Sequence, residues 1–256
     1  MKIIIGNLKM NLANLAERKK YLDWMKKEWA SRKVKNTEVV ICPPFLHLES
    51  FRKDLPKKMS LGAQNCFSEG KGSYTGEISP LMLKDLGAIY VILGHSERRR
   101  YFSENNEEIS RKVASVLGVG LHPVLCVGES ELEREEGRMM GVIEKQLIEG
   151  LILSKKTLFE KLVIAYEPIW SVGTDDVPAA NEIMGAKLLI RKILIETFGK
   201  KYGEMPRIIY GGSVSSKTVE EVCLKSDMDG ALIGRESLIP SEFMRIAEII
   251  DKNSKN

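Results

Sequence analysis

The stretch VILGHSERRR, residues 91–100, joins a short apolar run directly to a histidine, a glutamate and three arginines. A continuous apolar run of this length is typical of a strand that is buried on both faces, as in a parallel sheet covered by helices. A strand of that kind rarely ends in so many titratable groups. The stretch therefore indicates a buried parallel strand whose end is either a solvated edge or a reactive site.

Seven further runs resemble this one, and amphipathic stretches with helical spacing separate them. With AIYVILG (88–94), the runs are KIIIGNLK (2–9), TEVVICPP (37–44), MSLGAQN (59–65), GLHPVLCVGE (120–129), KLVIAYEP (161–168), PRIIYGG (206–212) and MDGALIG (228–234). Eight strands alternating with helices predict an α/β fold, a single (β/α)8 barrel with eight parallel strands. No linker divides the chain, so residues 1–256 are predicted to form one domain. An open doubly wound sheet is the alternative, but no G-x-G-x-x-G follows an early strand.

A helix is predicted between the fifth and sixth runs. Its opening, SELEREE (130–136), places acidic residues where a helix amino terminus favours them. Apolar residues then recur at spacings close to helical turns, at Leu132, Met140, Ile143, Leu147 and Leu151.

The composition excludes several classes of function. The net charge is +4, and the 39 basic and 35 acidic residues are spread along the chain, which argues against a nucleic-acid partner. The four cysteines form no CxxC pair and no metal-like cluster with histidine, so a reducing compartment and no metal are expected. No signal peptide or membrane span is recognisable, and we expect a soluble cytoplasmic protein.

Polar residues gather at the carboxyl ends of the predicted strands. Because these ends form one open face of a barrel, their side chains are expected to converge. Taken alone, His95 and Glu167 are more often structural residues, and Lys9 is simply a lysine beside a strand. The residues at these ends are Asn7, Lys9, Cys42, Gln64, Asn65, His95, Glu97, Cys126, Glu129, Glu167, Gly211 to Ser213 and Gly234.

Eight motifs together resemble the triosephosphate isomerase family: GNLKMN, LGAQN, GSYTGE, ILGHSERR, PVLCVGE, AYEPIWSVGT, YGGSV and GALIGRESL. They follow one another from residue 6 to residue 238 and so cover nearly the whole chain. The resemblance implies a TIM barrel that acts in glycolysis and gluconeogenesis without a cofactor. It also implies a homodimer and a triose phosphate substrate.

The resemblance assigns four catalytic residues. An aldose–ketose isomerisation through an enediolate needs a base and an electrophile. Glu167 is expected to be the base, in partly apolar surroundings, and His95 to polarise the carbonyl as a neutral imidazole. Lys9 is expected to supply a fixed positive charge, with Asn7 donating a hydrogen bond beside it.

The resemblance also assigns the substrate phosphate to backbone N–H groups of Gly173, Ser213, Gly234 and Arg235. Supporting positions are Ser96, Glu97, Cys126 and Tyr210. The arginines at 98–100 are expected to pair with acids such as Asp227 or to face a subunit interface.

The chain departs from the family pattern at four positions. Leu8 stands where tryptophan is usual, Asp175 where glycine is usual, and Arg235 where a second glycine is common. Pro178 stands where an amide often bonds a tyrosine, here Tyr210, and proline has no N–H. None of these departures removes a reacting group.

Two long loops are expected to be functional. Residues 168–180 would form a lid with Tyr210 and Ser213 as its latches. Because Pro178 cannot donate to Tyr210, the Ser213 hydroxyl is expected to contact lid backbone near Asp175 and to carry more of the latching than is usual. In the family, the loop of residues 65–77 docks into a partner subunit, with Thr75 reaching toward the partner's site.

Two other functions fit the same scaffold less well. A non-catalytic phosphate-sugar binder is expected to lack the base or the electrophile, but this chain retains both. A Schiff-base aldolase needs a lysine in the middle of a strand, whereas the sixth run ends in Glu167.

Overall fold

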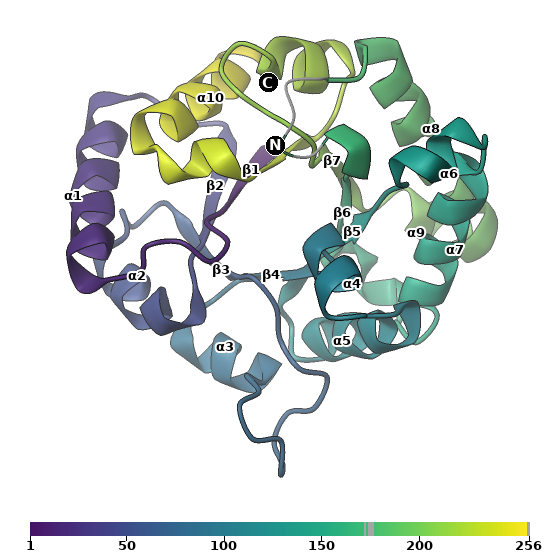
Figure 1. Cartoon of the computed structure of the whole chain (residues 1–256), viewed down its shortest axis with the longest axis horizontal. Coiled ribbons are helices and arrows are strands. Elements are labelled where there is room, and N and C mark those ends of the chain that lie inside the picture. Colours follow the sequence, from purple (N-terminus) through teal and green to yellow (C-terminus); the bar gives the residue numbers. More distant parts are fainter. Residues whose placement is uncertain (172, 174–176, 255–256) are drawn as a thin grey trace.

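Eight parallel strands form one closed barrel in the computed structural model, which describes residues 1–171, 173 and 177–254. The strands pair in chain order, and each lies within the run that the sequence predicted. They are β1 (Lys2–Asn7), β2 (Thr37–Cys42), β3 (Ser60–Ala63), β4 (Tyr90–Leu93), β5 (His122–Val127), β6 (Val163–Tyr166), β7 (Arg207–Tyr210) and β8 (Gly230–Ile233). The predicted TIM barrel is therefore confirmed (Figure 1).

Helices form a ring outside the barrel (Figure 1). They are α1 (Leu15–Ser31), α2 (Leu48–Asp54), α3 (Pro80–Leu86), α4 (Ser96–Tyr101), α5 (Asn106–Gly118), α6 (Glu131–Glu135), α7 (Met139–Leu151), α8 (Ala180–Phe198), α9 (Lys200–Gly203) and α10 (Pro240–Asn253). Short helical segments are η1 (Phe45–His47), η2 (Lys156–Lys161), η3 (Ile169–Ser171), η4 (Glu220–Lys225) and η5 (Arg235–Leu238). Within the described ranges, no helix is both long enough and apolar enough to cross a membrane.

Alternate residues of most strands build two apolar layers. In β1, Ile3 and Ile5 belong to the cluster inside the barrel, whereas Ile4 packs in the larger cluster between strands and helices. All three side chains are fully buried. Burial on both faces explains why the strands read as continuous apolar runs rather than as an alternating pattern.

The barrel closes where β1 meets β8. Ile3 is in register with Gly230, and the Ile3 amide donates to the Asp229 carbonyl at 3.0 Å. Gly230 has a φ of 153°, and a Cβ added to it would lie 1.7 Å from the Ile3 carbonyl oxygen. The two backbones therefore approach so closely that only glycine fits at this seam.

The helix predicted between the fifth and sixth strands is broken into two. The Ser130 side chain caps α6 as its acidic opening predicted, but Gly137, with a φ of 69°, follows the end of this helix. After it, α7 buries Ile143, Leu147 and Leu151. Leu132 and Met140, which belong to the same periodic series of apolar residues, are instead 59% and 62% exposed.

The segment between β3 and α3 projects from the body of the molecule (Figure 1). Phe67 and Tyr74 pack ring against ring within it, with centroids 4.6 Å apart. Tyr74 and Thr75 are nevertheless exposed. The loop thus presents an aromatic and a hydroxyl side chain away from the barrel.

Candidate active site

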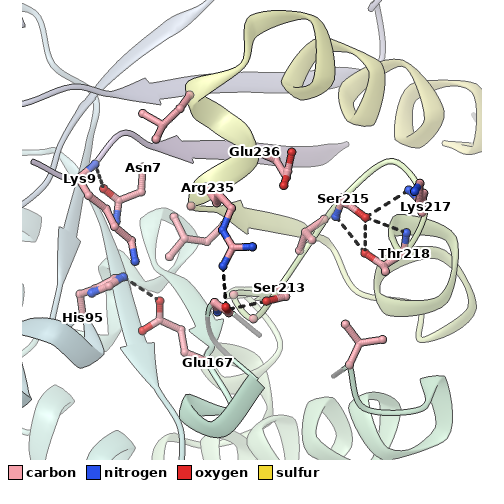
Figure 2. A pocket seen from close by; sticks show the side chains of 18 of the residues that line it. Asn7, Lys9, His95, Glu167, Ser213, Ser215, Lys217, Thr218, Arg235 and Glu236 are labelled. Atoms are coloured by element: carbon pink, nitrogen blue, oxygen red, sulfur yellow. Dashed lines mark hydrogen bonds and ion pairs between the residues drawn. The ribbon is translucent and has the colours of Figure 1, made fainter. Parts of the chain in front are cut away.

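One pocket of about 620 Å³ opens at the carboxyl ends of the strands. All eight residues predicted for catalysis and substrate binding line it: Asn7, Lys9, His95, Glu167, Gly173, Ser213, Gly234 and Arg235. We call the first four the buried side and the last four the open side. Figure 2 shows Lys9, His95 and Glu167 close together, with Ser213 and Arg235 across the pocket from Lys9 and His95.

Glu167 directly follows β6 and is only 2% exposed. Its Oε1 lies 3.3 Å from His95 Nε2, and its Oε2 accepts a hydrogen bond of 3.3 Å from the Ser96 amide. Two glycines make room for it. A Cβ on Gly128 would lie 1.9 Å from the Glu167 carbonyl oxygen, and a Cβ on Gly211 would lie 2.6 Å from Glu167 Cγ.

His95 is the residue that caps the amino end of α4. Its Nδ1 accepts a hydrogen bond of 3.2 Å from the Glu97 amide. A nitrogen that accepts this bond carries no proton, so the neutral ring holds its hydrogen on Nε2. The N–H of His95 therefore points at Glu167 and into the pocket.

Lys9 has a left-handed backbone, with a φ of 50°, which is uncommon for a residue with a side chain. Two bonds hold it there: its amide donates to Asn7 Oδ1 at 3.1 Å, and its carbonyl accepts from Gln64 Nε2 at 2.9 Å. Its Nζ pairs with Glu97 Oε1 at 2.6 Å. Glu97 thus contacts both the amine and, through its amide, the imidazole.

Cys126 lies behind the buried side and is 1% exposed. Burial raises the pKa of its thiol well above the ordinary value, and the neighbouring Glu167 charge raises it further. The side chain is therefore an uncharged thiol at neutral pH.

Leu8 directly precedes Lys9 and stands where the family usually has tryptophan. Its side chain is fully buried, and the amine of Lys9 still lines the pocket.

On the open side, the side chains of Ser213 and Arg235 form hydrogen bonds with the backbone of the segment that follows β6. Ser213 Oγ donates to the Ser171 carbonyl at 2.7 Å and accepts from the Gly173 amide at 3.2 Å. The Arg235 guanidinium donates to the Gly173 carbonyl at 2.6 Å. Gly173 is thus bonded to residues that follow β7 and β8.

The predicted latches both reach the segment after β6. Tyr210, at the end of β7, is fully buried, and its hydroxyl lies 3.2 Å from Ser171 Oγ. Ser213 makes two bonds to the backbone of this segment. Residues 172 and 174–176, which include Asp175, lie outside the described residues, so the predicted contact near Asp175 stays a prediction.

The arginines after His95 bind local partners. Arg98 pairs with Glu104 at 3.1 Å, and Arg99 donates to the Gly94 carbonyl at 2.8 Å. The expected pairing with Asp227 was wrong. Asp227 follows η4, in a different part of the barrel from α4, and it pairs with Lys187 of α8 instead.

Sequence reasoning missed a group beside the pocket. Trp170 Nε1 donates to Glu129 at 3.0 Å, and the Arg134 guanidinium lies 3.8 Å from the centre of the Trp170 ring. Burial raises the pKa of Glu129. The position of Glu129 at the end of the fifth predicted strand was a usable signal for this group, whereas Arg134 carried none.

Two charged pocket residues and one asparagine also escaped prediction. Lys217, Glu236 and the lining residue Asn11 lie in loops or short segments that have no periodic pattern. Among the described parts of the chain, no three His, Cys, Asp or Glu side chains are grouped so that they would hold a metal ion.

The protein is a closed (β/α)8 barrel with a carboxylate, an imidazole and an amine at one mouth. These are groups that proton transfer requires, and together they define the class of protein, a barrel enzyme. Comparison with known proteins shows which family of barrel enzymes the chain belongs to. Residues 2–250 match the family model described as Triosephosphate isomerase. The chain belongs to the triosephosphate isomerase family, as its motifs predicted.

Relatives of known name agree with this assignment. A triosephosphate isomerase from Dictyoglomus thermophilum is 46% identical over 253 residues, covering 96% of this chain and 98% of the relative. One from Dictyoglomus turgidum is 44% identical over 248 residues, covering 96% and 98%. One from Thermoanaerobacter sp. is 43% identical over 245 residues, covering 95% and 97%. The prediction that the chain is an isomerase is confirmed.

Proposed function

We propose that this protein interconverts dihydroxyacetone phosphate and D-glyceraldehyde 3-phosphate through an enediolate. The observation that carries the proposal is the 3.3 Å separation of Glu167 Oε1 and His95 Nε2 in a pocket that Lys9 also lines. Membership of the family supports the choice of substrate.

Glu167 is proposed as the base that takes a proton from carbon. Its carboxylate is almost completely buried, so little water competes for its lone pairs. The Ser96 amide and the His95 ring hold its two oxygens, and this fixes the carboxylate in the pocket. We infer that substrate displaces at least one of these donors when Glu167 accepts the proton.

His95 is proposed as the electrophile. Because Nδ1 accepts from the Glu97 amide, the ring presents an Nε2–H donor to the pocket. A substrate carbonyl oxygen placed beside Glu167 can accept this bond, which strengthens as negative charge develops on the oxygen. The same N–H can then serve both oxygens of an enediolate in turn.

Lys9 is proposed to stabilise the negative charge of the intermediate. Its amine lines the pocket, and its Nζ lies 3.8 Å from where a Cβ of Gly234 would be. The amine therefore extends from the buried side toward Gly234 on the open side. Asn7 supports it by holding the left-handed backbone of Lys9 through its side-chain oxygen.

The open side is proposed to bind the phosphate. Ser213 and Gly234 line the pocket opposite the acid–base pair, and their backbone amides are suitable donors for an anion. Gly173 closes this side through its bond to Ser213. A phosphate held here would place the two reacting carbons beside Glu167.

A coupled assay of the purified protein tests the activity. With glyceraldehyde 3-phosphate as substrate, we expect dihydroxyacetone phosphate to form and to be reduced by an added dehydrogenase with NADH. In D2O part of the product should carry deuterium on the carbon that receives the proton, because protonated Glu167 can exchange its proton with solvent before it returns it. Folded protein without turnover would overturn the function.

We also propose that the protein is a homodimer. The loop at residues 65–77 projects from the body and exposes Tyr74 and Thr75, as a segment that docks into a second copy must (Figure 1). Replacing residues 69–76 with a short turn is expected to yield monomers with reduced activity. Light scattering of the unaltered protein should give twice the chain mass, and a fully active monomer would contradict the proposal.

A cytoplasmic location is proposed on the state of the cysteines. All four are free and buried, which suits a reducing compartment. Cell fractionation measures this directly, and recovery of the protein in an extracellular or membrane fraction would contradict it.

A further inference from the structure

Among the departures from the family pattern that the structure describes, Arg235 is the one that lines the pocket. It is the first residue of η5, directly after Gly234 at the end of β8. Its φ is not left-handed, so a side chain fits on this backbone without strain. Figure 2 shows its guanidinium pointing into the pocket near Ser213, where glycine would leave open space.

A short bond fixes this guanidinium. Nη2 donates to the Gly173 carbonyl at 2.6 Å, the length of a charge-assisted hydrogen bond. The amide of the same glycine donates to Ser213 Oγ at 3.2 Å. Gly173 therefore holds the arginine beside Ser213, a residue of the proposed phosphate site.

The charge of Arg235 is available to a ligand. Lys9 is paired with Glu97 at 2.6 Å, but no carboxylate of residues 1–171, 173 and 177–254 lies within 4.0 Å of the Arg235 guanidinium. A guanidinium has five N–H donors, and the bond to Gly173 uses one of them. The remaining donors suit a phosphate, which binds arginine through two oxygens at once.

We propose that the Arg235 side chain is a second cationic anchor for the substrate phosphate, and that the Gly173 carbonyl positions it. This inference rests on the proposed function, because it concerns the phosphate of the same substrate. Lys9 reaches the site from the end of β1 and Arg235 from the end of β8. Two cations that line the same pocket complement a dianion better than one.

Binding of inorganic phosphate to the purified full-length protein, measured by calorimetry, tests the proposal without relying on turnover. Arg235→Gln removes the charge and is expected to weaken phosphate binding roughly tenfold, the scale of one charge-assisted hydrogen bond. Arg235→Lys keeps the charge but loses the two-pronged geometry, so an intermediate affinity is expected. The loss should shrink at high ionic strength, because this side of the pocket is exposed.

Arg245→Gln is the matched control. Arg245 is an exposed arginine on α10 that does not line the pocket, so the same change of net charge there should alter phosphate affinity less than twofold. Equal affinities for Arg235→Gln and Arg245→Gln would overturn the inference. Full affinity in Arg235→Lys would overturn the two-pronged contact.

The isomerase assay separates this inference from the function on which it rests. An active wild-type protein whose Arg235→Gln variant keeps both its phosphate affinity and its KM refutes the anchor alone. An inactive wild-type protein refutes the proposed function, whatever the phosphate measurements give. For the anchor, we expect Arg235→Gln to raise KM more than it lowers kcat, since the guanidinium binds a part of the substrate that does not react.

Discussion

The buried and open sides of the pocket are built differently. On the buried side, Asn7, His95 and Glu167 are at most 6% exposed, and hydrogen bonds fix the imidazole and the carboxylate against each other. On the open side, Gly173 and Arg235 are exposed: the Gly173 amide donates to the Ser213 hydroxyl, and the Arg235 guanidinium donates to the Gly173 carbonyl. The family pattern is kept on the first side and changed at Arg235 on the second.

This difference fits the roles that we propose for the two sides. Proton transfer depends on the positions of groups to within about 1 Å, so a side that carries it out allows little variation. A phosphate is large and charged and is bound by many donors, and it must enter and leave through an opening. A side that binds it can therefore gain a donor without losing the others, as the change from the family's glycine to Arg235 illustrates.

The sharpest test of the buried side is Glu167→Gln. The amide fills the same space but is not a base, and turnover is expected to fall by about 10²- to 10⁴-fold. Steady-state kinetics measures this fall, and circular dichroism checks the fold. Glu160→Gln, an exposed site beside β6, should keep full activity. A Glu167→Gln enzyme with a near-normal rate would show that the base lies elsewhere.

His95→Gln tests whether the imidazole is an equal partner. Removing one oriented donor from a developing oxyanion costs roughly 10²-fold in kcat. His122→Gln is the control, because His122 begins β5 at the opposite end of the barrel. If the two histidine variants had equal activity, the electrophile would have to be another group.

Gly211→Ala moves the buried side without changing its chemistry. The new methyl group would lie 2.6 Å from Glu167 Cγ and 3.3 Å from the Tyr166 carbonyl oxygen, so the carboxylate must shift. We expect kcat to fall by roughly 10- to 100-fold, because small misplacements of a base are costly. Gly185→Ala in α8 is the control, since a methyl group there meets no atom within 4 Å. Normal kcat in Gly211→Ala would mean that the site tolerates the shift.

The smallest effects are expected on the open side. Ser213→Ala removes two hydrogen bonds to backbone, at Ser171 and Gly173, whereas Tyr210→Phe removes one, to Ser171 Oγ. With roughly 0.5 to 1 kcal/mol for each bond, turnover should fall by roughly tenfold in the first variant and a few-fold in the second. Equal losses in the two variants would contradict this ranking.

The fold could be predicted because each strand is buried on both faces. Residues such as Ile3, Ile4 and Ile5 all pack in apolar layers, and this produces runs that a single sequence reveals. Helix breaks were harder to predict. Gly137 ends α6 through its left-handed backbone, while apolar residues continue at helical spacing beyond it. The spacing alone gave no reason to separate the two helices.

The site was predictable where strand ends fix it. His95 follows β4 and Glu167 follows β6 at the same face of the barrel, so their convergence follows from topology. The rest depends on side-chain direction. The role of Arg235 is visible only from its contact with the Gly173 carbonyl, and that of Arg134 only from its contact with the Trp170 ring. Neither contact leaves a pattern in the sequence. The Asp227 pairing failed for the same reason.

The seam between Ile3 and Gly230 has a consequence for synthesis on the ribosome. The first strand emerges early, but its second neighbour is not made until about nine-tenths of the chain has been translated. Until then one edge of β1 has unpaired backbone groups, and such edges invite pairing with other chains. A nascent chain stalled before residue 229 is therefore expected to aggregate or bind chaperones more than one stalled after α10 has emerged. Equal recovery of both stalled chains from the soluble fraction would contradict this expectation.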